Sequence, residues 1–595
     1  MKGLQKHVVF LAFMVMGWGP LRAQGGGSGP AGTIAADRWL EVDLYWFDKD
    51  RIHGSAEEFW ARMAPFFEGI EGWKGVILNV GWLMDYVLDW RGNLDDPIAF
   101  PRQMHQENWF VVEGTLEGDL HQKQEQFRER FSHPATNLRK YYQNWTYRDL
   151  RELAATLRQI AADKYGFRDM KVGSFVLAWK SIYGGSPSNW SVRQPQAYRT
   201  MENFGTRMAN FDPTALLNAD STHYGAYPHG IAAGMHSYTF FGAQWGDLSR
   251  KVGLDAIVLR DGMVGPAVYS RGGPYGAAAS SDAAIDDAWS HATAELVKSV
   301  KMANPKDLVI GYSSAVSAVS DWRINCFDLE KIAEEGYLDA YIDQTWAGAW
   351  NEPGVREFEY WNRPVSGWTY QMAYMLLHGA VLAKSRVHHY QLTETFDAWE
   401  CWDVLHTVPE KLKWGIWAYS HAAVKTPGGI RMPAGAYVSW CNQGKRLLSE
   451  SDVRLLSETL NAAYRDAARV KDVAGPTIIY NRGAMEWQQA HDPGGDIKEW
   501  IDEYAGTLMK WSVPIFSAAR IEDLPFIHTD LPVLQTPVHL KPGVSTYIQG
   551  LIRRGKPVAI VGSPAGGVDP AIAELAGMDS RDREAGGVVR IGAVG

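Results

Sequence analysis

Five acidic residues follow short apolar runs of the sequence, at positions where the strands of a parallel sheet would end. In an α/β barrel the catalytic residues come from the carboxyl ends of the strands, so these acids are better catalytic candidates than acids on helices. Hydrolysis of a glycosidic bond needs two carboxyl groups on opposite sides of that bond, one protonated and one ionised. The pattern therefore predicts a glycosidase site, with the acidic candidates Asp85, Asp261, Asp343, Glu352 and Glu394.

Three of these acids are predicted to be catalytic. Glu394 ends the polar and aromatic run HHYQLTE, and we predict that it is the nucleophile. Asp261 ends the run LDAIVLRD, and Gly262 leaves the backbone beside it open, so we predict that Asp261 is the acid/base. Asp343, in YIDQTW, is the third candidate. A carboxylate at a strand end can instead cap the next helix or pair with an arginine, and this alternative stays open for each acid.

Tryptophan is the unusual feature of the composition. The chain has 26 Trp, as many as Tyr and more than the 21 Phe. A Trp ring presents a flat apolar surface that suits a sugar, although any single Trp is equally well explained as a core residue. Several Trp and polar residues fall at or just after the predicted strand ends. The predicted substrate-binding residues are Asp43, Trp82, Asp85, Trp179, Gln344, Trp346, Glu352 and Trp399.

The composition and the motifs exclude several other functions. The net charge is −9, so there is no basic excess to neutralise phosphates, and we expect no nucleic-acid partner. The cysteines Cys326, Cys401 and Cys441 are too widely spaced for a zinc motif or a disulfide scaffold. There is no P-loop, no glycine-rich dinucleotide motif between a strand and a helix, and no HExxH motif. We therefore expect no cofactor and no metal.

The first residues are typical of a signal peptide. Lys2 and Lys6 precede an apolar run over residues 8–16, and Ala23 is a plausible last residue before cleavage. We predict a signal peptide over residues 1–23 and a flexible linker over residues 24–35, which includes GGGSGPAG. No later stretch is long and apolar enough for a membrane helix. These features predict a secreted or periplasmic protein.

Eight short apolar runs alternate with helical or irregular stretches, which is the pattern of buried parallel strands joined by helices. Eight such units predict a (β/α)8 TIM barrel over residues 36–445, in the α/β class. An open doubly wound sheet is the alternative, but polar and aromatic residues end nearly every run, as a ring of catalytic loops requires. The predicted strands are 40–47, 75–82, 171–179, 254–261, 307–312, 338–346, 388–394 and 413–419.

A second α/β unit is predicted after the barrel. Residues 446–473 have a helical pattern and are expected to connect the two units. Short strand-like runs then recur at 476–480, 513–517, 532–534 and 557–561, separated by helical or loop segments. This pattern predicts a flavodoxin-like α/β domain over residues 474–595, whether or not the chain holds all of it.

A signal peptide, a barrel whose seventh strand ends in a glutamate, and a flavodoxin-like domain together resemble glycoside hydrolase family 42. That resemblance implies a retaining enzyme, and many enzymes of the family are β-galactosidases. The same resemblance implies that Glu394 occupies the position of the family's nucleophile. It also implies a homo-oligomer, most often a trimer, assembled through the second domain.

The chain departs from the family pattern at the fourth strand. The family has an Asn-Glu pair there, whereas this sequence has Arg260-Asp261, and its only Asn-Glu-Pro lies at residues 351–353. The sequence is therefore also similar to barrels of the α-galactosidase type, in which aspartates end the fourth and sixth strands. That similarity implies Asp261 as nucleophile and Asp343 as acid/base.

Two functions of different classes remain open. One is a secreted glycoside hydrolase that cleaves a poly- or oligosaccharide in polysaccharide degradation, with a carbohydrate as its partner. The other is a non-catalytic glycan-binding protein built on a degenerate barrel. Such a protein would keep its Trp surface and lose converging carboxylates, so the acids at strand ends favour the hydrolase.

Overall fold

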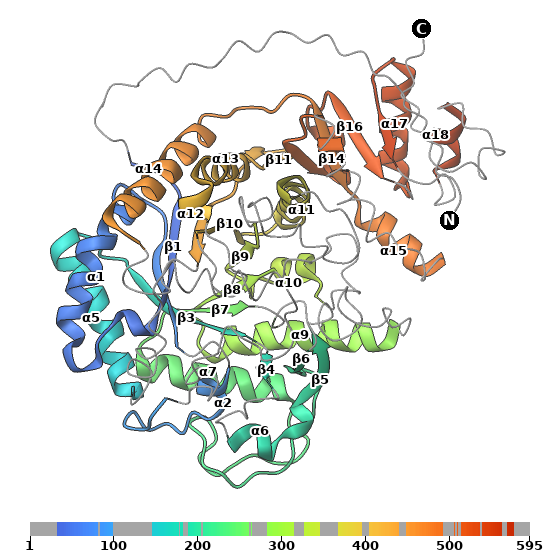
Figure 1. Ribbon diagram of the computed structural model, residues 1–595. Helices are drawn as coiled ribbons and strands as arrows, with labels where there is room; N and C mark the ends of the chain where they lie inside the picture. Colours follow the sequence, from blue (N-terminus) through green and yellow to red (C-terminus); the bar gives the residue numbers. More distant parts are fainter. Residues whose placement is uncertain are drawn as a thin grey trace. The chain divides into compact units, whose positions relative to one another are not determined.

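The computed structural model describes residues 33–80, 84–98, 145–177, 179–181, 189–203, 206–260, 263, 283–313, 327–345, 367–395, 404–439, 448–491, 505, 508–509, 513–535, 538–561 and 568–575. Eight parallel strands within these residues close into a barrel with helices around it, so the predicted (β/α)8 TIM barrel is confirmed (Figure 1). A separate mixed sheet follows, in the same compact unit Ile34–Gly595.

The barrel strands are short and buried on both faces, as expected where helices cover the outside of a parallel sheet. Each pairs in parallel register with its two neighbours in the ring. In ring order they are β1 (Asp37–Asp43), β13 (Gly435–Ser439), β10 (His388–Glu394), β9 (Ala340–Asp343), β8 (Leu308–Tyr312), β7 (Ala256–Arg260), β3 (Lys171–Leu177) and β2 (Lys74–Asn79).

Seven of the eight predicted strand runs overlap a barrel strand, and the eighth prediction is wrong. Residues 413–419 lie in helix α13 (Pro409–Ser420), and the last barrel strand is β13. The buried residues of α13 include Leu412, Ile416 and Tyr419, at the spacing of one helical face, while Trp414 and Trp417 are exposed. Pro409 also favours a helix start, because the first helical residue needs no backbone N–H donor.

Local sequence signals cap both ends of one helix of the outer layer, α5 (Tyr147–Tyr165). The residue before it, Thr146, forms a capping box with Asp149, and the residue after it, Gly166, has a left-handed φ of 72°. The barrel helices are α1 (Ile52–Phe67), α5 (Tyr147–Tyr165), α7 (Ser237–Val252), α9 (Ala283–Ala303), α10 (Leu329–Glu335), α11 (Gly367–Leu382), α13 and α14 (Glu450–Ala467).

Shorter elements decorate the connections of the barrel. Between β3 and β7 the chain forms a three-stranded antiparallel sheet. Its strands are β4 (Trp179–Ser181), β5 (Tyr198–Asn203) and β6 (Thr206–Phe211). The other short elements are α2 (Asp85–Leu88), α6 (Asn189–Arg193), α12 (Val404–Thr407), and the 3-10 helices η1 (Leu44–Trp46), η2 (Lys49–Arg51) and η4 (Pro195–Ala197).

The second sheet takes two of its strands from inside the barrel sequence. The hairpin of β11 (Ala423–Thr426) and β12 (Gly429–Arg431) precedes β13 in the chain, yet β11 pairs with β15 of the second sheet. The strand order is β12-β11-β15-β14-β16-β17, antiparallel only between β11 and β12. The remaining elements are β14 (Pro476–Tyr480), α15 (Arg482–His491), β15 (Ser517–Arg520), η8 (Ile521–Phe526), β16 (Leu531–Gln535), α17 (Pro542–Arg553), β17 (Ala559–Val561) and α18 (Pro570–Leu575).

The C-terminal part of this sheet has a doubly wound order. Counted from β14, the strands lie in the order second, first, third and fourth, which agrees with the first four positions of the flavodoxin-like order. The full flavodoxin-like domain stays a prediction, because residues 576–595 lie outside the described residues.

Helix α11 joins the barrel to the second sheet. It contacts barrel strand β10 and also β11, β14 and β15 of the second sheet. Its sequence, GWTYQMAYMLLHGAVL, is apolar on nearly all sides, as expected for a helix buried between two layers. The second sheet is therefore anchored to the barrel through a shared apolar helix.

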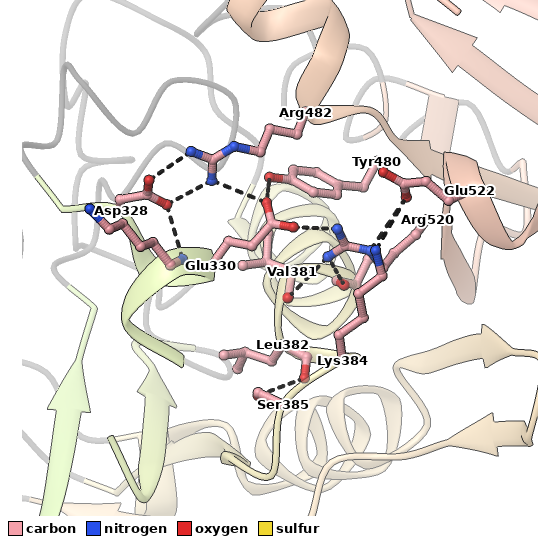
Figure 2. A network of polar contacts seen from close by, with 12 residues as sticks. Asp328, Glu330, Val381, Leu382, Lys384, Ser385, Tyr480, Arg482, Arg520 and Glu522 are labelled. Atoms are coloured by element: carbon pink, nitrogen blue, oxygen red, sulfur yellow. Dashed lines mark hydrogen bonds and ion pairs between the residues drawn. The ribbon is translucent and has the colours of Figure 1, made fainter. Parts of the chain in front are cut away.

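A network of charged side chains reinforces that connection (Figure 2). Arg482, at the start of α15, binds both carboxylate oxygens of Asp328 at 2.8 and 2.7 Å. Glu330 of α10 accepts from the Tyr480 hydroxyl at 2.8 Å and from the guanidinium groups of Arg482 and Arg520. Burial favours the neutral form of Glu330, but its basic and hydroxyl partners outweigh burial and hold its pKa below the ordinary value. Side chains at or just after the carboxyl ends of strands β14 and β15 are thus bonded to helix α10 of the barrel.

Candidate functional site

The carboxyl ends of the barrel strands form one mouth, because all eight strands are parallel. Polar or charged side chains end seven of these strands, and Leu177 ends β3. The polar strand ends are Asp43 of β1, Asn79 of β2, Arg260 of β7, Tyr312 of β8, Asp343 of β9, Glu394 of β10 and Ser439 of β13. A ring of this composition can bind a polyhydroxylated ligand and supply carboxyl groups for acid–base chemistry.

Asp43 and Asn79 form a buried pair on neighbouring strands. The two residues are in register, and the Asn79 amide donates to the Asp43 carboxylate at 2.5 Å. The amide fixes one carboxylate oxygen, which orients the group at the mouth. The structure therefore puts the predicted substrate-binding residue Asp43 at the expected end of β1.

A buried ion pair crosses the barrel two residues below Asp43. Arg260 of β7 donates to both carboxylate oxygens of Glu41 of β1, at 2.8 and 2.7 Å, and the Tyr437 hydroxyl donates to Glu41 at 2.6 Å. The guanidinium lies 5.2 Å from the ring centroid of Phe175 and 4.8 Å from that of Tyr312. Neither Glu41 nor Tyr437 was among the site residues predicted from the sequence. The only signal was a charged residue within each of two apolar strands.

Asp85 is buried at the start of α2, in the connection after β2. The neighbouring Tyr86 bonds to Ser174 and donates to the carbonyl oxygen of Phe175 at 3.1 Å, which fixes this helix to strand β3. Burial raises the pKa of Tyr198 in β5, and the carboxylate of Asp85 raises it further, so the small antiparallel sheet lies within electrostatic range of Asp85.

Asp343 ends β9 as predicted, but its carboxylate is directed at the helical layer. His378 of α11 donates to one oxygen at 2.6 Å, and His389 of β10 donates to the other at 2.6 Å. The side chain is completely buried, which opposes ionisation, yet the two histidines outweigh burial and lower the pKa of Asp343. Both oxygens are therefore used within the core. The next residue, Gln344, is also buried, and its backbone N–H donates to Ser313 at 2.9 Å.

Glu394 is the last residue of β10, and its backbone is in register with Ser439 at the end of β13. Trp179 begins β4 and is paired with Asn210 of β6. Arg260 is the last described residue before Asp261. The predicted site residues that lie outside the described residues are Trp82, Asp261, Trp346, Glu352 and Trp399.

Within the described residues, no three His, Cys, Asp or Glu side chains are grouped so that they could hold a metal ion. None of the helices there combines the length and the apolar character that crossing a bilayer requires.

Comparison with known proteins gives fold neighbours only. No protein-family model matches the chain, and neither does any curated protein. A β-galactosidase from Rahnella sp. R3 is similar at 11% identity and a TM-score of 0.43, over 89% of this chain and 71% of that one. The α-L-fucosidase isoenzyme 2 from Paenibacillus thiaminolyticus is similar at 11% identity and a TM-score of 0.44, over 92% of this chain and 66% of that one. A β-galactosidase from Bacillus circulans sp. alkalophilus is similar at 10% identity and a TM-score of 0.44, over 88% of this chain and 71% of that one. Likeness this distant assigns no activity to the chain.

Proposed function

We propose that the protein is a glycoside hydrolase whose site is the carboxyl-terminal mouth of the barrel. The observation that carries the proposal is the ring of strand ends, in which acids end β1 and β10 and a further acid, Asp85, follows β2. Such barrels bear their catalytic residues on this face. Carboxyl groups from different strands can stand on both sides of a bound glycosidic bond.

The proposed catalytic pair is Glu394 as nucleophile and Asp261 as acid/base, in a retaining mechanism. Strand β10 and strand β7, which Asp261 follows, are separated in the ring by β9 and β8. Carboxyl groups at these two ends would approach a substrate from different sides of the mouth. Asp43 and Asp85 would then accept hydrogen bonds from sugar hydroxyls, and Asn79 would hold Asp43 in position.

The α-galactosidase-like scheme, with Asp261 as nucleophile and Asp343 as acid/base, is less well supported. A general acid must hold a proton at working pH and deliver it to the leaving oxygen. Asp343 has a lowered pKa and both of its oxygens accept from buried histidines. These features suit a permanently ionised structural residue.

The remaining expectations belong to the same proposal. A protein with the leader-like residues 1–23 would be secreted or periplasmic, and degradation of an external polysaccharide would be its role. The resemblance to glycoside hydrolase family 42, with a flavodoxin-like second domain and a trimeric assembly, is a proposal about architecture. Sedimentation of the purified full chain would test the trimer.

The activity is tested by incubating the full chain with plant and algal glycans and with aryl glycosides. Mass spectrometry then identifies the products. We expect a cleaved glycan, and Glu394→Gln is expected to abolish its turnover. Glu458→Gln, at an exposed position of α14, is the matched control and is expected to leave turnover unchanged.

Two results would overturn the proposal. Glycans that bind without being cleaved by the wild type would favour the non-catalytic glycan-binding alternative. A Glu394→Gln variant with near-normal kcat would remove Glu394 as nucleophile. Proton NMR of the first product then decides the mechanism, since a retaining enzyme releases the anomer that it cleaved.

A further inference from the structure

An open cavity of about 280 Å³ lies in the helical layer, between α5 and the last turn of α7. Four cationic side chains line it, and no acidic side chain does. Arg151 and Arg158 are two turns apart on one face of α5, and Arg250 and Lys251 precede the end of α7 at Gly253. The cavity therefore gathers positive charge from two helices in a protein whose net charge is −9.

Two of the four cations are balanced by carboxylates that do not line the cavity. Arg158 bonds to Asp255 at 2.7 Å, and Lys251 bonds to Asp247 at 2.9 Å. Within the described part of the chain, Arg151 and Arg250 have no carboxylate within ion-pair distance. Two positive charges thus remain after every ion pair of the lining residues is counted.

Capping of helix ends explains part of this charge. Arg158 donates to the carbonyl oxygen of Gly253 at 2.9 Å, and Arg250 donates to that of Ala303 at the end of α9. The C-terminal end of a helix carries about half a negative charge, so these arginines are partly balanced and the cavity stays positive. Arg151 lies in the second turn of α5, where no helix carbonyl needs a cap. Its side chain is exposed and caps no helix, so it is available to a ligand in the cavity.

We propose that this cavity binds an oxyanion, a sulfate or phosphate group that is either a free ion or an ester on a glycan. Guanidinium groups match oxyanions because they present paired N–H donors in a fixed plane. The volume is slightly below the lower end, about 300 Å³, of ordinary ligand pockets, so the cavity suits one small anionic group. This site lies outside the barrel mouth and does not depend on the proposed hydrolase activity.

Calorimetric titration of the full chain with sodium sulfate, at an ionic strength held constant with sodium chloride, tests the site. We expect saturable binding that Arg151→Gln weakens by up to about fivefold, the size of one exposed charge interaction. Arg151→Lys, which keeps the charge, is expected to retain part of the affinity. Arg454→Gln, at an exposed position of α14, removes the same charge elsewhere and is expected to bind sulfate as the wild type does.

A second arm distinguishes the two sources of the anion. Dextran sulfate and unsulfated dextran are titrated in parallel, with sodium sulfate as competitor. Binding of dextran sulfate that sodium sulfate displaces, and that Arg151→Gln weakens, identifies an ester on a glycan as the ligand. Binding of sodium sulfate alone identifies a free ion. Absence of saturable sulfate binding, or equal affinity in the wild type and in Arg151→Gln, would overturn the proposal.

Discussion

The guanidinium of Arg260 spans the barrel interior to hold both carboxylate oxygens of Glu41, at 2.8 and 2.7 Å. The two residues come from β7 and β1, which are separated in the ring by β3 and β2. Tyr437 of β13 donates a third hydrogen bond to the same carboxylate. Strands β1, β7 and β13, which are far apart in the sequence, are therefore joined directly below the mouth. This contact fixes the end of β1, which bears Asp43, and the end of β7, which Asp261 follows.

This pair predicts a large loss of stability when one partner is removed. Glu41→Gln leaves the charge of Arg260 buried without its counter-charge, which costs about 3–5 kcal/mol in comparable buried pairs. We expect the midpoint of urea unfolding, measured by circular dichroism, to fall accordingly.

An exposed pair provides the control for Glu41. Arg51 and Glu58 bond at 2.6 Å, but their side chains are 60% and 59% exposed. Water screens such pairs, so Glu58→Gln is expected to change the free energy of unfolding by less than about 1 kcal/mol. Equal midpoint shifts for the two variants would contradict the role given to the cross-barrel pair.

The connection between the barrel and the second sheet makes a separate prediction. Glu330→Gln removes the nearer of the two carboxylates that face Arg520, whose side chain is only 2% exposed, and leaves Glu522 at 3.5 Å (Figure 2). Arg520 also bonds to the carbonyl oxygens of Ala380 and Val381. We expect a lower melting temperature and faster proteolysis at the connection between the two sheets, because a buried arginine loses its closest carboxylate.

The matched control for Glu330 uses an arginine of the same network. Glu486 bonds to Arg482 at 2.8 Å, but its side chain is 52% exposed. Glu486→Gln is therefore expected to leave the melting temperature and the proteolysis rate close to those of the wild type. If both variants lowered the melting temperature equally, burial of the network would not be its source of stability.

Close packing inside the barrel predicts the effect of one added methyl group. A Cβ at Gly75 of β2 would lie 2.0 Å from the ring of Trp39 on β1, which is far inside contact distance. Gly75→Ala is expected to destabilise the fold by about 1–3 kcal/mol, because Trp39 is completely buried and has little room to move. Chemical denaturation of the full chain measures this loss.

Gly543 is the control for added volume. A Cβ there would meet nothing within 4 Å, and the residue lies in the first turn of α17. Gly543→Ala is expected to be neutral or to stabilise by up to about 1 kcal/mol, since alanine loses less conformational entropy in a helix. A destabilised Gly543→Ala and an unaffected Gly75→Ala would refute the packing argument.

The sequence predicted the barrel because its strands are apolar runs that end in polar residues, a pattern that turns and helices interrupt regularly. It failed at the eighth strand for a physical reason. The run KWGIWAY has the composition of a buried strand, but its exposed Trp414 and Trp417 and buried Ile416 fit a helix that is only half covered. The true strand, GAYVS, follows a hairpin that belongs to the second sheet.

The candidate site was harder to predict than the fold. Asp343 was correctly placed at a strand end, but a strand buried on both faces has no alternation of polar and apolar residues to show which way each side chain points. Glu41 and Arg260 are 219 residues apart, so no local pattern could join them. Pairing of charges across a barrel follows from strand order and register, which only the folded chain defines.

The last prediction concerns the pH dependence of Asp343. Its pKa is lowered in the folded chain from an ordinary value of 3.8, since His378 and His389 outweigh the effect of burial. The unfolded chain therefore takes up a proton at a higher pH than the folded chain does. The stability that the ionised carboxylate contributes is complete above the unfolded pKa, about 4, and is lost as the pH falls through the folded pKa.

Asp343→Asn is therefore expected to melt at a lower temperature than the wild type at neutral pH, with the gap narrowing below a pH of about 4. Asp466→Asn, whose carboxylate is 53% exposed on α14, is the control and should show no such gap. Scanning calorimetry from neutral to acidic pH measures both variants. A difference in melting temperature between Asp343→Asn and the wild type that stays constant across this pH range would contradict a stabilising role of the ionised Asp343 carboxylate. A normal melting temperature with abolished turnover would return Asp343 to the catalytic pair, because a structural carboxylate bound to two histidines cannot be lost without a cost in stability.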